Sequence, residues 1–282
     1  MTNAQHRRPR SRGNRPDHRL RRVAIAVGVI GALVALGVAF VKLSSTHGPA
    51  PPTTTAGVGP LDLTSPPSLK IEPWTLIATL LGPTPGFATS TSATPSQLLP
   101  AEWSGAASAL PVIESKNGRL EVRLLLRPNG VTAWIPSSAA SVSRTPFHVV
   151  VDLEAMQLLF FNEAKLVMRA PAGVGVDDAP TPPGNYFVAE LAEAPNPGYG
   201  SFVIVTSAFA NTVTDWEQNG DAMITINGPL GTDALIRSHG AAVSRGSIRL
   251  LDPDLVRLRV LPLGTPVDVV ATYRPLGHPT PA

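Results

Sequence analysis

The sequence predicts a mostly β protein in which two β-rich segments follow an N-terminal transmembrane helix. First, short runs rich in Val, Ile and Phe recur between residues 75 and 272, and these residue types are typical of strands. Second, Asn-Gly pairs and 30 prolines separate the runs, which favours hairpins, loops and linkers. Third, an uncharged run of 19 residues precedes all of them. A chain of 282 residues is long enough for this organisation.

The apolar run is residues 23–41, VAIAVGVIGALVALGVAFV. About 20 helical residues cross the ~30 Å hydrocarbon layer of a membrane. The arm before it, residues 1–22, carries eight arginines, whereas no charge lies between Lys42 and Asp62. The positive-inside rule therefore predicts a single-pass cell-membrane protein with a cytoplasmic N-terminus and extracytoplasmic C-terminal domains. A cleaved signal peptide and a buried core helix are the alternatives, but the apolar region of a signal peptide spans only about 7–15 residues.

Charge is unevenly distributed along the chain. Residues 1–42 carry nine basic side chains and one acidic, whereas the rest of the chain carries 14 basic and 19 acidic. A nucleic-acid site would need a basic surface on the folded domains, so no nucleic-acid partner is expected. The sequence has no cysteine, which excludes disulfides, thiolate metal sites and thiol catalysis.

No metal or cofactor is expected either. Asp177-Asp178 is interpreted as an exposed turn pair, not as a set of metal ligands. Gly173-Val174-Gly175 is interpreted as a turn, because no helix follows it to bind a phosphate.

Residues 42–70 predict a tether, because a Pro/Thr/Ser/Gly-rich segment without an apolar period cannot bury enough surface to offset its ordering entropy. Residues 71–142 predict a small β module. Its strands are expected at 75–81, 120–126 and 131–136. Its hairpin turns are expected at Asn117-Gly118 and Asn129-Gly130.

Residues 130–142, GVTAWIPSSAASV, resemble the last hairpin of bacterial SH3-like modules, with Ala133 at the usual glycine position. The resemblance implies a small SH3-like β-barrel. Trp74, Trp103 and Trp134 are expected in its core, and a ligand groove is the alternative.

Residues 143–273 predict a second β domain, a sandwich or barrel with little helix, and residues 274–282 a tail. One helix is expected, with Asp252 as N-cap and Pro253 at the first helical position. His148 is expected on the surface, on the same strand face as Asp152. The strands are expected at 147–153, 157–162, 165–170, 186–191, 201–205, 223–227 and 266–272.

Three stretches of the second domain form a set. They are residues 149–175, the segment TPPGNYF at 181–187, and INGPLG at 226–231 with AVSRGSIRLLD at 242–252. In this order they resemble the opening hairpin, the Thr-Pro-x-Gly-x-Phe step and the two catalytic motifs of the L,D-transpeptidase (YkuD-like) family, which cross-links peptidoglycan stem peptides. The 16 residues between Asn227 and Ser244 match the separation of those motifs. The resemblance implies an L,D-transpeptidase-like β-sandwich with one short helix.

The sequence departs from the family at the reactive positions. Ser247 stands where the family has its nucleophilic Cys, and Asn227 stands where it has the His that resembles the general base. Arg245 replaces the second His of the family. The other motif residues are retained, namely Gly228, Gly246, Ile248 and Arg249.

These replacements remove the family's covalent route. A serine hydroxyl acts as a nucleophile only with a positioned general base, and an Asn side chain accepts no proton near neutral pH. Backbone N–H groups near Gly246 and Ser247 would still be available as an oxyanion hole. His239 is the alternative base for Ser247, and a loop histidine without a catalytic role is the simpler interpretation.

Arg245 and Arg249 are the candidate binders of a stem-peptide carboxylate, near Gly228 and His239, because a guanidinium donates forked hydrogen bonds. The alternatives are an internal ion pair of Arg249, for example with Asp252, and a solvent-exposed Arg245.

Three functions follow from these expectations. The first is a membrane-anchored, catalytically impaired family member that binds peptidoglycan stem peptides or regulates active cell-wall enzymes. The second is an active acyltransferase that uses Ser247 with His239. The third is a non-catalytic wall-binding or scaffolding module. Whether the chain is an enzyme stays open at this point, with the pseudoenzyme favoured.

Overall fold

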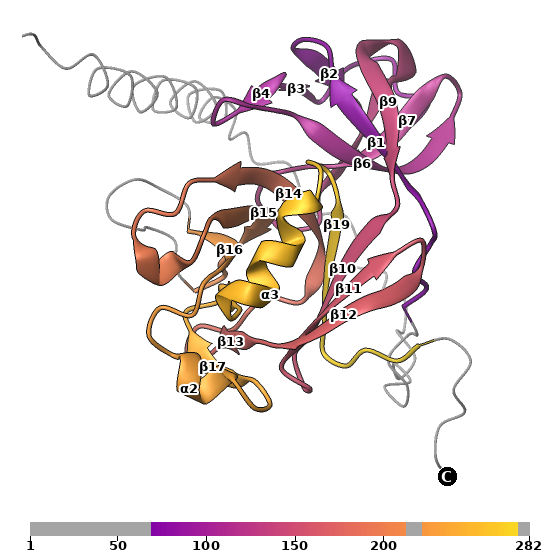
Figure 1. Cartoon of the computed structure of the whole chain (residues 1–282). Coiled ribbons are helices and arrows are strands. Elements are labelled where there is room, and N and C mark those ends of the chain that lie inside the picture. Colours follow the sequence, from indigo (N-terminus) through magenta and orange to yellow (C-terminus); the bar gives the residue numbers. More distant parts are fainter. Residues whose placement is uncertain (1–68, 213–221, 276–282) are drawn as a thin grey trace, which may run out of the picture. The chain divides into compact units, whose positions relative to one another are not determined.

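The computed structural model describes residues 69–212 and 222–275, which belong to one compact unit (Figure 1). The predicted basic arm, the transmembrane helix at 23–41 and most of the tether lie outside these residues. Among the described residues, no helix is long and apolar enough to span a membrane.

The N-terminal part is a five-stranded antiparallel sheet in the order β8-β7-β6-β1-β9. Its strands are β1 (Thr75–Leu80), β6 (Ala109–Lys116), β7 (Arg119–Arg123), β8 (Thr132–Pro136) and β9 (Ala140–Thr145), with the 3-10 turn η1 (Ser137–Ala139) before the last. Two ribbons lie between β1 and β6 in the chain, β2 (Thr84–Gly86) with β3 (Gln97–Leu99) and β4 (Glu102–Trp103) with β5 (Ala106–Ala107). The three predicted strands are present, although β7 ends three residues early.

Both predicted Asn-Gly turns join strands of this sheet. Asn117 and Gly118 have φ angles of 52° and 71°, as a type I′ turn between β6 and β7 requires. Gly130, with φ 87°, lies in the longer loop between β7 and β8. Within the described residues, no strand pairing joins β8 to β9, so hydrogen bonds do not close the sheet into a barrel.

The three tryptophans of this part differ in burial. Trp134 is 8% exposed, as expected for a core residue, and its backbone bridges to Phe87. Trp103 is half-buried against the core. The expectation is wrong for Trp74, which precedes β1, is 41% exposed and carries the Arg144 guanidinium 4.6 Å from its ring centroid.

The remaining strands form one ten-stranded sheet in the order β12-β11-β10-β19-β14-β15-β16-β18-β13-β17 (Figure 1). They are β10 (Phe147–Asp152), β11 (Gln157–Asn162), β12 (Lys165–Pro171), β13 (Gly173–Gly175), β14 (Gly184–Ala192), β15 (Val203–Phe209), β16 (Met223–Asn227), β17 (Ala241–Ser244), β18 (Ile248–Arg249) and β19 (Pro266–Val270). Every strand expected in this domain is present, and β15 runs further than its predicted bounds.

Both halves of this sheet face a common core. Val149 and Val151 of β10 lie in the same buried cluster as Ile224 and Ile226 of β16. The strand β14 pairs with β19 on one side and β15 on the other, so it links the two halves. The predicted sandwich is therefore a continuous sheet whose halves enclose one core.

The predicted helix is α3 (Asp252–Arg257), extended by the 3-10 turn η3 (Leu258–Val260). Leu255 and Leu258 are fully buried in the large core. The N-cap assignment is wrong, because Asp252 is the first helical residue and its carboxylate accepts hydrogen bonds from the N–H and hydroxyl of Ser201 at 2.7–2.9 Å. Two more helical turns are α2 (Asp233–Ile236) and η2 (Pro197–Tyr199).

The segment Gly173–Gly175 is strand β13, not a turn, and it pairs with β17 and β18. A Cβ at Gly173 would lie 2.8 Å from Val243 and 3.0 Å from Arg249, so the glycine allows these strands to approach. Sequence periodicity missed this strand because it is short and its neighbours are distant in the chain.

His148 is 8% exposed, so its predicted surface position is wrong. Its Nε2 lies 2.8 Å from Asp268 Oδ2 on the neighbouring strand β19. The face of β10 that carries His148 is covered, because Val150 belongs to a buried cluster against which Ile71 and Tyr273 pack. His148 and Asp152 do lie on the same face of β10, as strand alternation predicts. The sequence did not show that segments at both ends of the described unit cover this face.

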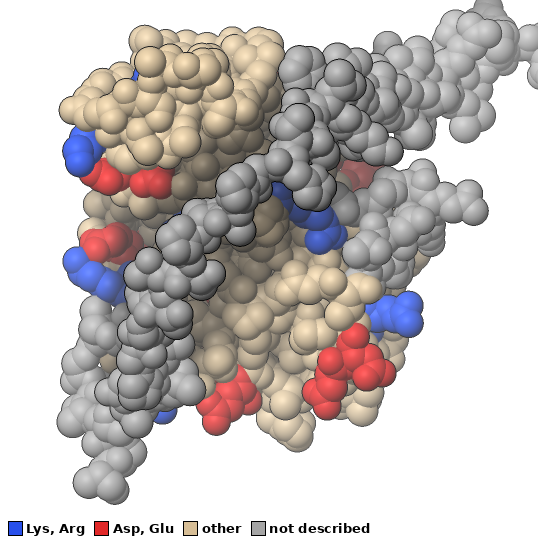
Figure 2. All heavy atoms as spheres, turned by 180° about the vertical axis from the view of Figure 1, so that it is seen from behind, with Lys and Arg blue, Asp and Glu red and all other residues tan. Residues whose placement is uncertain are grey.

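The two sheets are in contact. Phe187 and Ala189 of β14 belong to the core cluster of the five-stranded sheet. The Asn129 amide accepts a hydrogen bond from Phe209 N–H at 2.9 Å and donates one to Phe209 O at 2.8 Å. On the face shown in Figure 2, the visible acidic and basic side chains lie in small separate groups.

Candidate functional site

Four polar residues in or beside the catalytic motifs share one face of the large sheet. Thr225 and Asn227 are two residues apart on β16, and Ser247 and Arg249 are two apart at β18. The strands pair in parallel with Asn227 opposite Arg249. Because side chains alternate along a strand, these four point away from the core. The residues between and beside them are buried in it, namely Ile224, Ile226, Ile248 and Leu250.

The turn before Ser247 is held by two hydroxyl groups. Ser244 Oγ donates to Ser247 O at 2.6 Å and accepts from Gly246 N–H at 3.1 Å. Thr181, from the second motif stretch, donates to Gly246 O at 2.7 Å and accepts from Gly175 N–H at 2.9 Å. The structure thus joins all three motif stretches around this turn.

Gly246 has φ 111°, where an L side chain is strained, and its missing Cβ would lie 2.8 Å from Ile224 Cδ1. The backbone conformation therefore favours glycine at this position, and a larger residue would also have to displace the end of the Ile224 side chain. This explains in physical terms why Gly246 is retained although its neighbours in the motif are replaced.

Asn227 is 1% exposed, and both ends of its amide are engaged. Its Nδ2 donates to Gly228 O at 2.8 Å, which leaves Oδ1 to accept from the Thr225 hydroxyl at 2.9 Å. The Thr225 hydroxyl lies 3.1 Å from Ser247 Oγ, and the Thr225 N–H donates to the same oxygen at 3.3 Å. Thr225 therefore connects Asn227 to Ser247. The sequence did not predict a role for Thr225.

The number of protons that Asn227, Thr225 and Ser247 can donate decides what this hydrogen-bonded group can do chemically. A hydroxyl has one proton, so at any moment Thr225 donates to either Asn227 Oδ1 or Ser247 Oγ. Each of the three groups is a neutral amide or hydroxyl, and none is a base near neutral pH. The hydrogen-bonded chain therefore orients the Ser247 hydroxyl without activating it.

Gly228 brings a further loop to this face. A Cβ on Gly228 would lie 2.4 Å from Gly200 N, so only glycine permits this approach. Gly228 N–H donates to Tyr199 O at 2.7 Å, and Leu230 N–H donates to Gly198 O at 3.0 Å. These contacts fix η2 beside the end of β16.

Arg249 is half-buried, and its Nε is buried without a hydrogen-bond partner among the described residues. Burial lowers the pKa of the guanidinium, and the nearby Tyr199 partly offsets this. The internal pair with Asp252 is wrong, because that carboxylate is occupied by Ser201. In the part of the chain that the structure describes, no carboxylate forms an ion pair with Arg249.

The remaining candidates are more peripheral. Arg245 is exposed, in the turn between β17 and β18. His239 is exposed after α2, and its Nδ1 lies 2.7 Å from Ser238 Oγ. No hydrogen bond between the described residues joins His239 to Ser247, whose hydroxyl contacts Thr225 instead.

The family comparison agrees with this geometry. Residues 146–269 match the model of the YkuD family, described as the L,D-transpeptidase catalytic domain. The match begins after β9 and ends within β19, so it covers the ten-stranded sheet and the whole polar face.

Similar solved structures are L,D-transpeptidases of low identity. One, from Mycobacterium smegmatis, is 16% identical, with 57% of this chain and 82% of that chain covered and a TM-score of 0.36. L,D-transpeptidase 3 from Mycobacterium tuberculosis, in complex with a faropenem-derived adduct, is 16% identical with 51% and 75% covered and a TM-score of 0.35. The catalytic domain of the E. faecium enzyme is 20% identical with 44% and 96% covered and a TM-score of 0.31.

No curated protein matches the chain. The family assignment depends on the family-model match, with its ordered motif stretches around the Gly246 turn. The chain therefore contains, over residues 146–269, a domain of the L,D-transpeptidase catalytic family.

Proposed function

We propose that this protein is a membrane-anchored cell-wall protein that binds peptidoglycan stem peptides without the acyl transfer of its family. One observation carries the proposal: the neutral hydrogen-bonded chain Asn227–Thr225–Ser247. Among the described residues no base hydrogen-bonds to Ser247, and Asn227 is too deeply buried to contact a ligand. The nucleophile and base of the family reaction are therefore both missing.

Arg249 supports the binding role. A half-buried guanidinium whose Nε has no partner among the described residues has lost part of its hydration without an ion pair in return. A ligand carboxylate on this face would supply the missing acceptor through a charge-assisted, forked hydrogen bond. Stem peptides end in a carboxylate, which suits this cation.

The location is part of the same proposal. The Arg-rich arm and the apolar run at 23–41 favour an uncleaved anchor, with residues after Lys42 outside the cytoplasmic membrane. We also propose that residues 71–142 form an SH3-like module. Its support is the strand order, in which β1 lies between β6 and β9, and the 3-10 turn η1 before β9.

The first test is the intact mass of the protein after incubation with a carbapenem, which acylates a competent nucleophile. We expect no adduct on the wild-type chain, because no base activates Ser247. An adduct at Ser247 that disappears in His239→Ala would instead establish the alternative, a serine acyltransferase. In the described part of the chain these two residues share no hydrogen bond, which argues against that outcome.

The second test is the affinity for a stem tetrapeptide, measured by calorimetry. Arg249→Ala should weaken binding roughly 10- to 100-fold, since a hydrogen bond to a charged group contributes about 1.5–3 kcal/mol. The exposed Arg237 on the C-terminal side of α2 is the control, and Arg237→Ala should leave the affinity unchanged. Equal losses in both variants would show a general charge effect and contradict a specific site.

A further inference from the structure

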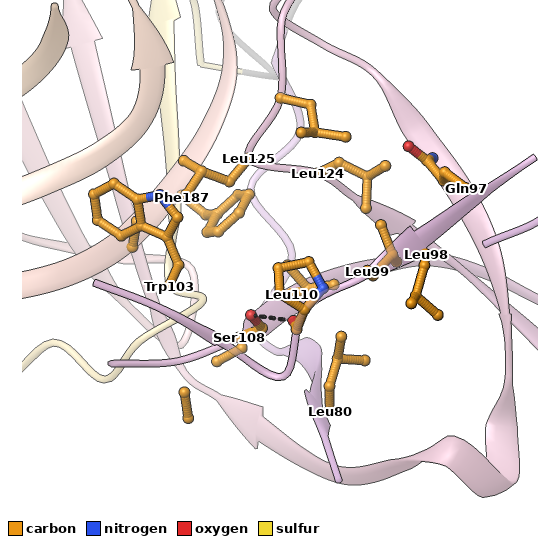
Figure 3. Close-up of a pocket in the computed structure, with 15 residues that line it drawn as sticks. Leu80, Gln97, Leu98, Leu99, Trp103, Ser108, Leu110, Leu124, Leu125 and Phe187 are labelled. Carbon is orange, nitrogen blue, oxygen red and sulfur yellow. Dashed lines mark hydrogen bonds between the residues drawn. The ribbon is translucent and has the colours of Figure 1, made fainter. Parts of the chain in front are cut away.

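A hollow lies away from the polar face, between the five-stranded sheet and β14. It is a cavity of about 270 Å³, and the two stretches that carry the replaced catalytic positions, 226–231 and 242–252, contribute nothing to its walls among the described residues. Figure 3 shows leucines from several strands and loops around it, with Trp103 and Phe187 on one side. Phe187 and Ala189 come from β14, so both sheets contribute to the wall.

Most of the side chains that line the cavity are aliphatic or aromatic. Among the described residues that line the cavity, none is charged. Ser108 lines the cavity, but its hydroxyl already donates to Pro100 O at 2.8 Å (Figure 3). Gln97 at one edge is the other polar side chain in this described lining. A ligand in this cavity would therefore be recognised by apolar contact.

The mouth of the cavity is also apolar. Leu98 is 69% exposed and Leu126 is 39% exposed, and both line the cavity. Single exposed leucines are common on protein surfaces, but exposed leucines that border an apolar cavity mark a binding groove. The apolar surface continues from the rim to Trp103 inside.

We propose that this cavity binds one alkyl chain of a membrane lipid. An engineered apolar cavity of about 150 Å³ accepts benzene, whereas pockets for drug-sized ligands start at about 300 Å³. A volume of about 270 Å³ lies between these and suits a segment of a single acyl chain. The apolar mouth lets the rest of the lipid remain outside.

The membrane is the proposed source of the lipid because the proposed anchor would hold the folded part of the chain close to it. The proposed anchor ends at Val41, and the described structure begins at Leu69. Residues 42–68 have a maximum reach of about 90 Å, so their length permits the cavity to contact the bilayer surface. The inference thus depends on the proposed anchor, and the test below separates the two.

The experiment uses the full-length protein in phosphatidylcholine liposomes that contain a lipid with a photoreactive diazirine in its acyl chain. After irradiation, labelled peptides are identified by mass spectrometry. We expect labels in residues 97–110 and 124–126, in addition to the anchor. Flotation of the liposomes measures anchoring independently.

Two neighbouring alanines on β5 provide matched variants. Ala107 lines the cavity, whereas Ala106 does not. Ala107→Trp should fill the cavity and reduce labelling of its walls about tenfold, a loss of roughly 1.4 kcal/mol of affinity. Ala106→Trp should not reduce it. Thermal unfolding of both variants excludes misfolding as the cause.

The outcomes distinguish the two hypotheses. Protein that floats but is labelled only in the anchor overturns the cavity as a lipid site and leaves the anchor intact. Equal labelling of the cavity walls in both variants overturns it as well. Protein that does not float contradicts the anchor and the membrane as source. In that case a free photoreactive fatty acid shows whether the cavity still accepts an alkyl chain.

Discussion

The polar face at Ser247 and the leucine-lined cavity at Trp103 differ in whether their side chains contact one another or leave space between them. On the polar face, Asn227, Thr225 and Ser247 hydrogen-bond to one another, so little chemistry is left for a ligand except at Arg249. In the cavity, the described side chains enclose about 270 Å³ that none of them fills. The polar groups of Asn227, Thr225 and Ser247 are therefore engaged with one another, whereas neither motif stretch lines the cavity among the described residues.

The two regions also differ in what sets their shape. A Cβ on Gly228 would overlap the backbone of Gly200, and Gly246 has φ 111°, so the backbone of the polar face depends on both glycines. The shape of the cavity depends instead on the side chains that line it.

The largest expected effect comes from restoring the reactive pair. Ser247→Cys with Asn227→His should raise the rate of acylation by a carbapenem roughly 100-fold or more over either single variant, since nucleophile and base act as a unit. Intact-mass kinetics measure this. Ser247→Cys alone should gain little, because a buried Asn cannot hold a thiolate.

A suitable control for this pair is Thr225→Val added to the double substitution, which removes the hydroxyl that bridges both positions. Acylation should survive this control, because the imidazole introduced by Asn227→His acts on the thiol without the Thr225 hydroxyl as a relay. An equally active Ser247→Cys single variant would show that another base serves this site.

The second effect compares two tryptophans of the N-terminal part, of which Trp103 lines the cavity and Trp134 does not. Trp134→Ala should lower the free energy of unfolding by about 3–5 kcal/mol, as expected for a large buried side chain. Trp103→Ala should lower it by only about 1–2 kcal/mol, because this residue borders space that is already empty. Denaturant unfolding measures both, and equal losses would mean that the cavity is filled in solution.

The smallest effect is a pH dependence next to the cavity. Burial raises the pKa of Glu190, and a hydrogen bond from Ser104 partly opposes this. The folded state therefore holds the proton more tightly than the unfolded state, so Glu190 makes stability fall as pH rises from the unfolded pKa through the folded pKa. Glu190→Gln should lessen this fall above about pH 4, read as unfolding midpoints. Glu193→Gln, at an exposed position, is the matched control for the loss of one carboxyl group.

Local pattern was sufficient for most of the strands. The runs rich in Val, Ile and Phe predicted β10, β11, β16 and β19 closely, and the Asn117-Gly118 pair predicted its hairpin turn. These features depend on residues that are neighbours in the chain. The strand at Gly173–Gly175 was missed because its pairing depends on β17 and β18, more than 60 residues away.

The candidate site divides in the same way. Motif order and spacing placed Asn227, Gly246, Ser247 and Arg249 in one region, and the structure brings Asn227, Ser247 and Arg249 to one face with Gly246 in the adjoining turn. Thr225 was missed because it belongs to no motif and acts only through contacts with both replaced positions. The buried His148–Asp268 pair was missed because burial depends on distant segments that cover the strand.

The sequence by itself determined the strand pattern, the order of the motif stretches and the presence of Ser247 and Asn227 in them, since these depend on residue identity and local spacing. Only the tertiary structure decided that Asn227 is buried, that Arg249 has no internal carboxylate partner among the described residues, and that an apolar cavity lies between the two sheets. The physical reason is that burial, ion pairing and cavities depend on which distant segments meet, and alternation along one strand cannot specify its neighbours.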